Sequence, residues 1–320
     1  MHRLDARTMA QITDLRVAGD EGVLDHARRR PRRAGLTEDG RLVILAADHP
    51  ARMVTAVGED PIAMGDRADY LGRIVRVLGE GHVDGLMGTP DILEEVLAVD
   101  YLSVLRGEDS FLDEKLLVGC MNRGGLWGTT FEMDDTFTAF EAPQMVAMNL
   151  DAAKMMFRLD PMDYASGRTI TACARAIDRC VDTGLTVFLE PLPVTFNDGK
   201  YAVDNSVENL VKVCGVASGL GKTSWKTWLK LPWGVDYSRV AAATTCPILM
   251  LGGPAKGGIA GLLGELSQGL AAGHNVRGAL VGRNVLFPGD LDPAMAAAAV
   301  WGIVHRGLSA EEALGVVAGD

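Results

Sequence analysis

Eight short apolar runs, separated by stretches with helical patterning, constrain the fold of this chain more than any other feature. The runs are Leu42–Ala47, Val83–Met87, Leu116–Cys120, Ala153–Phe157, Leu185–Leu189, Thr227–Leu231, Pro247–Leu251 and Ala279–Gly282. Most are almost continuously apolar, which is typical of parallel strands covered on both faces. Helices are expected at Ile62–Leu78, Ala165–Thr183, Ser206–Ala217, Ile259–Ala272 and Pro293–Gly307. This alternation predicts an α/β fold, a closed (β/α)8 TIM barrel, rather than a doubly wound sheet, which seldom needs eight such units.

The 320 residues contain no linker and no internal repeat, so a single catalytic barrel domain is expected over residues 41–320. Residues 1–40 are predicted to form an N-terminal helical extension that caps the bottom of the barrel or mediates subunit contacts. The segment 121–140 contains Gly124, Gly125, Gly128 and the acidic stretch Glu132–Asp135. It is too long for a simple connection, which indicates a functional loop over the top of the barrel.

Charge and cysteine usage exclude several classes of protein. The net charge is −11, and the one basic cluster, Arg28 to Arg33, is interpreted as a solvated helix end, so no nucleic-acid partner is predicted. No apolar run reaches the about 18 residues of a membrane span, and no signal-peptide pattern begins the chain. The five cysteines are scattered and lack CxxC spacing. Reduced thiols and a cytoplasmic location are therefore expected.

In a TIM barrel the active site lies at the carboxyl ends of the strands. Asp48 and His49 follow the first apolar run directly. A carboxylate at this place could orient a substrate hydroxyl group. The alternative is a helix-capping aspartate beside a histidine in a loop.

Two predicted strands carry lysines within apolar surroundings. Lys154 and Arg158 share one face of the fourth strand, and Lys226 and Lys230 share one face of the sixth. Lys230 lies nearer the carboxyl end, so it is the candidate nucleophile. A partly dry pocket, or a second cation such as Lys154, would lower its pKa from about 10.4 and free its lone pair. Lys154 could instead be a structural ion-pair partner.

The fifth strand ends in Glu190, where burial and neighbouring cations would act on its pKa in opposite directions. A glutamate held between these influences can accept and donate protons. Glu190 is therefore the candidate acid–base group.

Glycines end the seventh and eighth strands. The first of these ends reads Gly252-Gly253-Pro254, with Gly257 nearby, and the second reads Gly282-Arg283. Glycine lets backbone N–H groups approach an anion, following helix N-termini attract it, and barrel enzymes often bind phosphate at these two loops. The alternative is that the glycines only make tight turns.

A metal site is not predicted. The six histidines are dispersed, and only His49 falls at the carboxyl end of a strand. Metal-dependent aldol cleavage needs several imidazoles that converge on one ion. No cofactor is implied.

The order of these short motifs over residues 42–290 resembles the archaeal-type class I fructose-bisphosphate aldolases. The resemblance rests on Asp48-His49, the lysine on strand six, Gly252-Gly253-Pro254 and the Val-Gly-Arg-Asn-Val sequence around Arg283. The fourth and fifth strands, with Asp151–Lys154 and Phe188–Pro191, resemble the tagatose-1,6-bisphosphate aldolase branch of the same superfamily. The chain is also similar to a group of barrel proteins associated with actinobacterial inositol-catabolism clusters.

The resemblance implies that Lys230 forms a Schiff base, Glu190 moves protons, Asp48 orients a hydroxyl and Lys154 is a neighbouring cation. Gly252, Gly253, Gly282 and Arg283 would bind phosphate, and His49 and Arg158 would contact substrate. The archaeal-type enzymes carry a tyrosine where Glu190 stands. In several relatives the lysine precedes threonine and an aromatic residue, which makes Lys226 the alternative nucleophile.

The function expected is therefore that of a metal-independent class I aldolase that acts on a phosphorylated ketose or keto-sugar acid. Two alternatives remain open. One is a non-covalent phosphosugar isomerase or synthase, and the other is a catalytically silent protein that binds a sugar phosphate. A homo-oligomer is also expected.

Overall fold

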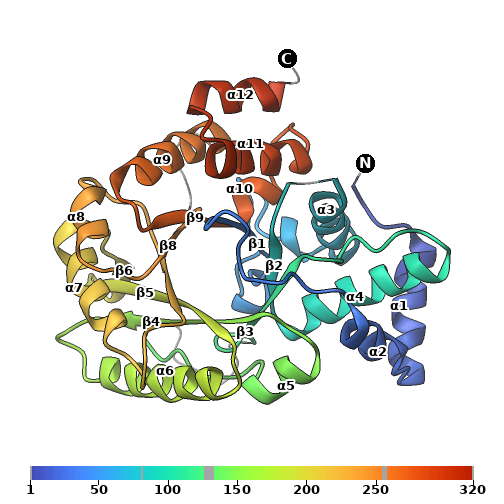
Figure 1. Ribbon diagram of the computed structural model, residues 1–320, viewed down its shortest axis with the longest axis horizontal. Helices are drawn as coiled ribbons and strands as arrows, with labels where there is room; N and C mark the ends of the chain where they lie inside the picture. Colours follow the sequence, from blue (N-terminus) through green and yellow to red (C-terminus); the bar gives the residue numbers. More distant parts are fainter. Residues whose placement is uncertain (1, 81, 126–132, 254–257, 319–320) are drawn as a thin grey trace.

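Eight parallel strands close into a barrel in the computed structural model, which describes residues 2–80, 82–125, 133–253 and 258–318 (Figure 1). The barrel strands are β1 (Leu42–Ala46), β2 (Gly85–Gly88), β3 (Leu116–Cys120), β4 (Ala152–Leu159), β5 (Thr186–Asn197), β7 (Thr227–Leu231), β8 (Ile248–Leu251) and β9 (Val276–Val281). They run in the order β4-β3-β2-β1-β9-β8-β7-β5, and pairing of β4 with β5 closes the circle. The predicted TIM barrel is confirmed.

The β4–β5 pairing is the longest in the barrel. It extends over eight residue pairs, from Ala152 opposite Thr186 to Leu159 opposite Pro193. Every other pairing of barrel strands has three or four residue pairs. These two strands therefore project furthest beyond the carboxyl end of the barrel.

A short ninth strand, β6 (Lys200–Val203), was not expected. The fifth strand continues past its predicted end at Leu189, reaches Asn197 and turns back to pair antiparallel with β6. The turn residues Asp198 and Gly199 both have positive φ, the backbone that a two-residue hairpin requires. The second strand also differs slightly, since it begins at Gly85 rather than Val83.

Helices surround the barrel (Figure 1). They are α3 (Arg67–Glu80), α4 (Pro90–Leu105), α5 (Ala142–Ala147), α6 (Ala165–Asp182), α7 (Val207–Ser218), α8 (Tyr237–Ala242), α9 (Gly258–Ala272), α10 (Arg283–Leu286), α11 (Pro293–Arg306) and α12 (Ala310–Ala318). The helix expected from Ile62 begins only at Arg67. Its start is set by Asp66, whose carboxylate accepts hydrogen bonds from the backbone N–H groups of Ala68 and Asp69.

The first 40 residues divide into two parts. Helices α1 (Ala6–Ala18) and α2 (Gly22–Arg29) pack against α4 on the outside of the barrel (Figure 1). The segment that follows covers the bottom: Arg30 donates to the carbonyl of Lys115 at 2.6 Å and pairs with Asp151 at 2.9 Å. Leu36 packs against the apolar cluster inside the barrel.

Within the described ranges, no helix combines the length and the apolar character needed to cross a membrane.

Candidate active site

Alternation along the strands separates the barrel interior into an apolar lower part and a charged upper part. Ala152, Phe188 and Trp228 belong to or pack against the interior apolar cluster. Two residues further along the same strands stand Lys154, Glu190 and Lys230. Because side chains alternate along a strand, these three charged groups share the interior face with the apolar residues below them.

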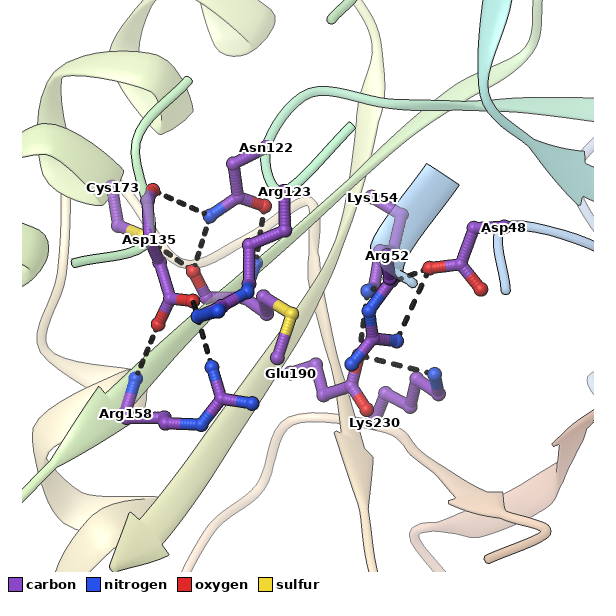
Figure 2. Close-up of polar contacts among 11 residues, drawn as sticks. Asp48, Arg52, Asn122, Arg123, Asp135, Lys154, Arg158, Cys173, Glu190 and Lys230 are labelled. Carbon is purple, nitrogen blue, oxygen red and sulfur yellow. Dashed lines mark hydrogen bonds and ion pairs between the residues drawn. The ribbon is translucent and has the colours of Figure 1, made fainter. Parts of the chain in front are cut away.

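Five charged side chains cluster in the upper interior and are joined by a row of successive contacts (Figure 2). Nζ of Lys230 lies 3.1 Å from Oε2 of Glu190, and Nζ of Lys154 lies 2.6 Å from the same oxygen. Lys154 also lies 3.5 Å from Oδ2 of Asp48, and Nη1 of Arg52 lies 3.3 Å from that oxygen. The order is Arg52, Asp48, Lys154, Glu190, Lys230, so positive and negative groups alternate.

The two lysines respond differently to these surroundings. Burial lowers the pKa of Lys230, and the repulsion from Lys154 and Arg52 adds to this effect, so that the attraction of Glu190 and Asp48 is outweighed. Burial also opposes the charge on Lys154, but Glu190 and Asp48 both face it and raise its pKa. Lys230 is therefore the lysine that loses its proton more readily.

Glu190 is a carboxylate in this environment. Its burial favours the protonated form, but Lys154 and Lys230 together hold the pKa far below its usual range. The pKa of Asp48 is likewise well below its usual value, because Lys154 and Arg52 outweigh the effect of burial. Both acids are thus ionised and can accept hydrogen bonds.

A cavity of about 460 Å³ opens above this row. Its lining includes four cationic side chains, Arg52, Arg158, Lys230 and Arg283, and three acidic ones, Asp48, Glu190 and Glu265. Gly252, Gly253, Gly282 and His49 line it as well. Lys154 lies beneath the cavity and is buried from solvent. The cavity thus presents fixed arginine cations and carboxylates side by side to a ligand.

The glycine-ended strands approach their neighbours closely. A Cβ atom on Gly282 would lie 2.4 Å from Cε1 of His49 and 2.7 Å from the carbonyl oxygen of Ala46. Asn284 donates to the carbonyl of Gly253 at 2.8 Å and so ties the two glycine loops together. Gly282 therefore has a packing requirement in addition to the anion-binding role proposed for it. Pro254 and Gly257 lie outside the described residues, and the helix after Gly282 has only four residues.

His49 is uncharged at neutral pH, since burial and the neighbouring cations lower its pKa to about 4. Its Nδ1 atom is buried and has no hydrogen-bond partner among the described residues. The ring can therefore act as a neutral hydrogen-bonding group in the cavity wall but adds no positive charge.

A second charged cluster lies at the carboxyl end of β4 (Figure 2). Asp135 pairs with Arg123 at 2.6 Å and with Arg158 at 2.9 Å, and it also accepts from the backbone N–H of Arg158. The Asn122 side chain bonds both backbone groups of Met156. The described ends of the segment 121–140 are thus fastened to β4, whereas Gly128, Glu132 and the other residues of 126–132 lie outside the described residues.

Lys226 does not reach the cavity. It precedes the first residue of β7, is exposed at the opposite end of the barrel and donates to the carbonyl of Gly184 at 2.9 Å. All ten residues expected in the site do lie in or directly beneath the cavity. Three further charged residues, Arg52, Arg123 and Asp135, were not expected because they lie in segments between strands, where no periodic pattern gives the direction of a side chain.

Across the described ranges, no group of three or more His, Cys, Asp or Glu side chains could hold a metal ion.

Solved structures of class I aldolases share this barrel. A fructose-bisphosphate aldolase from Slackia heliotrinireducens is 15% identical, with a TM-score of 0.66, over 99% of this chain and 92% of its own. A Schiff base-forming fructose-1,6-bisphosphate aldolase is 21% identical, with a TM-score of 0.58, over 88% of this chain and 100% of its own. At such identities the similarity establishes the fold alone, and the class is that of a TIM barrel.

A closer relationship defines the family. The family description Cgl0159-like matches residues 40–300. The crystal structure of Cgl0159 from Corynebacterium glutamicum is 35% identical, with a TM-score of 0.86, over 95% of this chain and 99% of that one. The chain belongs to the Cgl0159-like family. Comparison with curated proteins gave no match.

Proposed function

We propose that this protein is a class I aldolase that cleaves or forms a C–C bond of a phosphorylated ketose or keto-sugar acid through a Schiff base on Lys230. One observation carries the proposal. The Lys230 amine is buried in the floor of a cation-lined cavity, and it shares one oxygen of Glu190 with a second lysine, Lys154. This arrangement favours an uncharged amine next to a carboxylate, which is what Schiff-base chemistry needs.

The proposed reaction begins when the uncharged Lys230 amine adds to the ketone carbon, and loss of water leaves an iminium ion. The bond between the α-carbon and the hydroxyl-bearing β-carbon then breaks. Its electron pair moves toward the iminium ion to give an enamine. The proton of the hydroxyl on the departing carbon passes to Glu190, directly or through water, and an aldehyde leaves. Protonation of the enamine carbon and hydrolysis release the ketone product and restore the amine.

The neighbouring groups support this sequence of steps. Glu190 is ionised, so it can accept the hydroxyl proton, and Asp48 can accept a hydrogen bond from a substrate hydroxyl. Lys154 is held between both carboxylates and stays charged, so it can stabilise negative charge that develops on an oxygen.

The phosphate is proposed to bind at Gly252, Gly253, Gly282 and Arg283. These residues line the same cavity as Lys230. Binding of a group remote from the reacting bond would position the ketone carbon against the amine. The homo-oligomer expected from the sequence stays a prediction.

The test is reductive trapping. The full-length protein is incubated with dihydroxyacetone phosphate and sodium borohydride, and the adduct is located by peptide mass spectrometry. One reduced adduct on Lys230 is expected, and Lys226→Met, the matched control, should trap equally well. An adduct on Lys226, or no adduct together with turnover of a phosphosugar, would contradict the proposal and favour a non-covalent isomerase in the second case.

A further inference from the structure

We infer that Arg52 sets the ionisation of Lys230. Arg52 is the permanently charged group at the other end of the row of five contacting side chains, and its charge favours the uncharged form of the Lys230 amine. Its catalytic meaning rests on the proposed Schiff-base function, whereas the ionisation itself can be measured without substrate. Arg52 pairs with Asp48 rather than with Lys230, so it is a positioning residue that acts through Asp48, Lys154 and Glu190.

The row is continuous because neighbouring groups share oxygen atoms. Arg52 and Lys154 both face Oδ2 of Asp48, at 3.3 and 3.5 Å. Lys154 and Lys230 both face Oε2 of Glu190, at 2.6 and 3.1 Å. Each carboxylate is therefore held between two cations, and Arg52 and Lys230 each contact one carboxylate of the row.

The net charge of the row depends on the two end groups, Arg52 and Lys230. When all five groups are ionised, three cations face two carboxylates, which leaves one surplus positive charge. An unbalanced charge is costly in a buried cluster. Loss of one proton from a lysine balances the row, with Arg52 and Lys154 facing Asp48 and Glu190.

Lys230 is the member that can supply this proton. Arg52 is a guanidinium, which keeps its charge, and the attraction of Asp48 and Glu190 raises its pKa even though burial opposes that charge. Lys154 lies between two carboxylates. Among the carboxylates of the described residues, Lys230 has only that of Glu190 at contact distance. Without Arg52, the row would be balanced with Lys230 protonated, and the amine would keep its proton.

The backbone fixes Arg52 in place. It ends the 3-10 turn Pro50–Arg52, and its N–H donates to the carbonyl of His49 at 3.0 Å. Gly125 donates to the carbonyl of the preceding Ala51 at 2.8 Å, which anchors the turn to the segment after β3. The Arg52 side chain is 18% exposed, at the edge of the cavity.

Other titratable groups near Lys230 do not change this balance. They are Cys120 on β3, His49 after β1, Arg158 on β4, Glu265 on α9 and Arg283 after β9. Burial raises the pKa of Cys120 far above neutrality, so its thiol is uncharged, and His49 is also uncharged. Arg158 is paired with Asp135, and Arg283 and Glu265 lie in the cavity wall outside the row.

Competitive acetylation measures the ionisation of Lys230 directly, because acetic anhydride reacts only with uncharged amines. The rate of Lys230 acetylation is followed by peptide mass spectrometry from pH 6 to 11. In Arg52→Met the midpoint of the profile should move up by about one pH unit or more. Arg52→Lys, which keeps the charge, should restore the wild-type midpoint, and circular dichroism verifies the fold of each variant.

Two further variants make the test specific. Arg158→Met removes the same charge from the cavity wall but not from the row, and it should move the midpoint much less. Asp48→Asn removes a negative charge from the row, and it should move the midpoint down. This second variant keeps the inference testable if Arg52→Met does not fold.

The inference is overturned if Arg52→Met leaves the midpoint in place, if Arg158→Met moves it equally, if Arg52→Lys fails to restore it, or if Asp48→Asn moves it up. The outcome is separate from the proposed function. If the midpoint shifts but the wild-type protein gives no trapped adduct, the aldolase proposal fails and the role of Arg52 in the ionisation of Lys230 stands. If an adduct is trapped but the midpoint does not move, the aldolase proposal stands and the role of Arg52 fails.

Discussion

Lys226 and Lys230 stand four residues apart near one strand and have opposite environments. Lys226 is exposed and bonds a carbonyl at the bottom of the barrel, whereas Lys230 is buried beside Glu190 at the top. The alternation of side chains along a strand predicted that both lysines share one face. It could not show that Lys226 precedes the first paired residue, Thr227, and is therefore free to leave that face.

Replacement of Lys230 is expected to abolish catalysis. In Lys230→Met, aldol cleavage of a phosphorylated ketose should fall by about three orders of magnitude or more, because the covalent route is lost. Lys226→Met should keep wild-type activity, as its side chain faces away from the cavity. A coupled assay for the released aldehyde measures both, and equal losses would contradict the assignment.

Gly282 is expected to tolerate no side chain. In Gly282→Ala the added Cβ would overlap the His49 ring and the Ala46 carbonyl, so the first and last strands must move apart. A loss of about 1–3 kcal/mol of unfolding free energy is expected, together with weaker binding of inorganic phosphate. Urea unfolding and calorimetry measure the two effects. As the control, Gly264→Ala inside α9, where a Cβ meets no atom within 4 Å, should leave phosphate binding unchanged and should not lower the unfolding free energy, because alanine favours a helix over glycine.

The residues at strand ends could be predicted from the sequence, and Arg52 could not. Asp48, Glu190 and Lys230 each follow or end an apolar run whose direction is set by the barrel. Arg52 lies beyond the strand in a 3-10 turn, where neither spacing nor composition gives the direction of a side chain. Its place depends on contacts with Asp48 that only the folded chain brings together.

Among the elements, the segment after β3 shows how a loop is coupled to a strand. Asp135 pairs with Arg123 from its own segment and with both the side chain and the backbone of Arg158 on β4. Asp135 is buried, and burial raises its pKa although both arginines oppose this. The carboxylate thus holds Arg158 at the wall of the cavity.

Loss of this carboxylate should weaken substrate binding more than turnover. In Asp135→Asn we expect KM for a phosphorylated ketose to rise about tenfold, with a smaller change in kcat, because Arg158 is no longer fixed. Steady-state kinetics give both constants. The matched control, Asp134→Asn, changes a half-buried neighbour whose carboxylate accepts a hydrogen bond from Thr136 and, among the described residues, pairs with no arginine. A change confined to kcat would contradict a binding role.

The β5–β6 hairpin shows a signal that sequence reasoning overlooked. Asp198-Gly199 is a strong hairpin signal when it lies between residues with strand propensity. The apolar run that predicted the fifth strand stops at Leu189, and Pro191 and Pro193 follow it. The β5 strand continues through both, and its residues Leu189 to Pro193 pair with β4.

At the scale of the whole molecule, His305 joins three distant parts of the chain at the bottom of the barrel. This α11 residue lies 2.8 Å from Asp39 of the N-terminal segment and 3.0 Å from Asp84, which precedes β2. Burial lowers its pKa, but the hydrogen bonds to Asp84 and Asp39 outweigh burial and raise it. The imidazole therefore ties the N-terminal segment and α11 to the segment before β2.

This contact should make stability depend on pH. Because the folded pKa is raised, the contribution is complete below about pH 6.5, the unfolded value, and is lost as the pH rises through the folded pKa. The difference in unfolding free energy between wild type and His305→Asn should be on the order of 1 kcal/mol at pH 6, since Asp39 is partly exposed, and should shrink by pH 9. Urea unfolding at both values measures it, and a difference that grows with pH would contradict the direction.

The barrel followed from the eight apolar runs, and the N-terminal helices were expected as an extension, but the helix on which they dock could not be predicted. Continuous apolar runs indicate strands buried on both faces, and eight of them leave few folds to choose from. Helices α1 and α2 bury only a small patch against α4, including Ile12, Val99 and Leu102. Such a patch gives too little pattern to identify which helix it covers.

The strands that carry the acid–base couple are also the strands whose eight residue pairs close the barrel. Opening that closure would separate Lys154 from Glu190 at the same moment as it unwinds the cylinder. The ability to form a Schiff base with a carbonyl compound should therefore be lost in one step, together with the cooperative unfolding of the protein. Borohydride trapping and far-ultraviolet circular dichroism should give superimposable urea curves, and capture that ends well before melting would show that the two are independent.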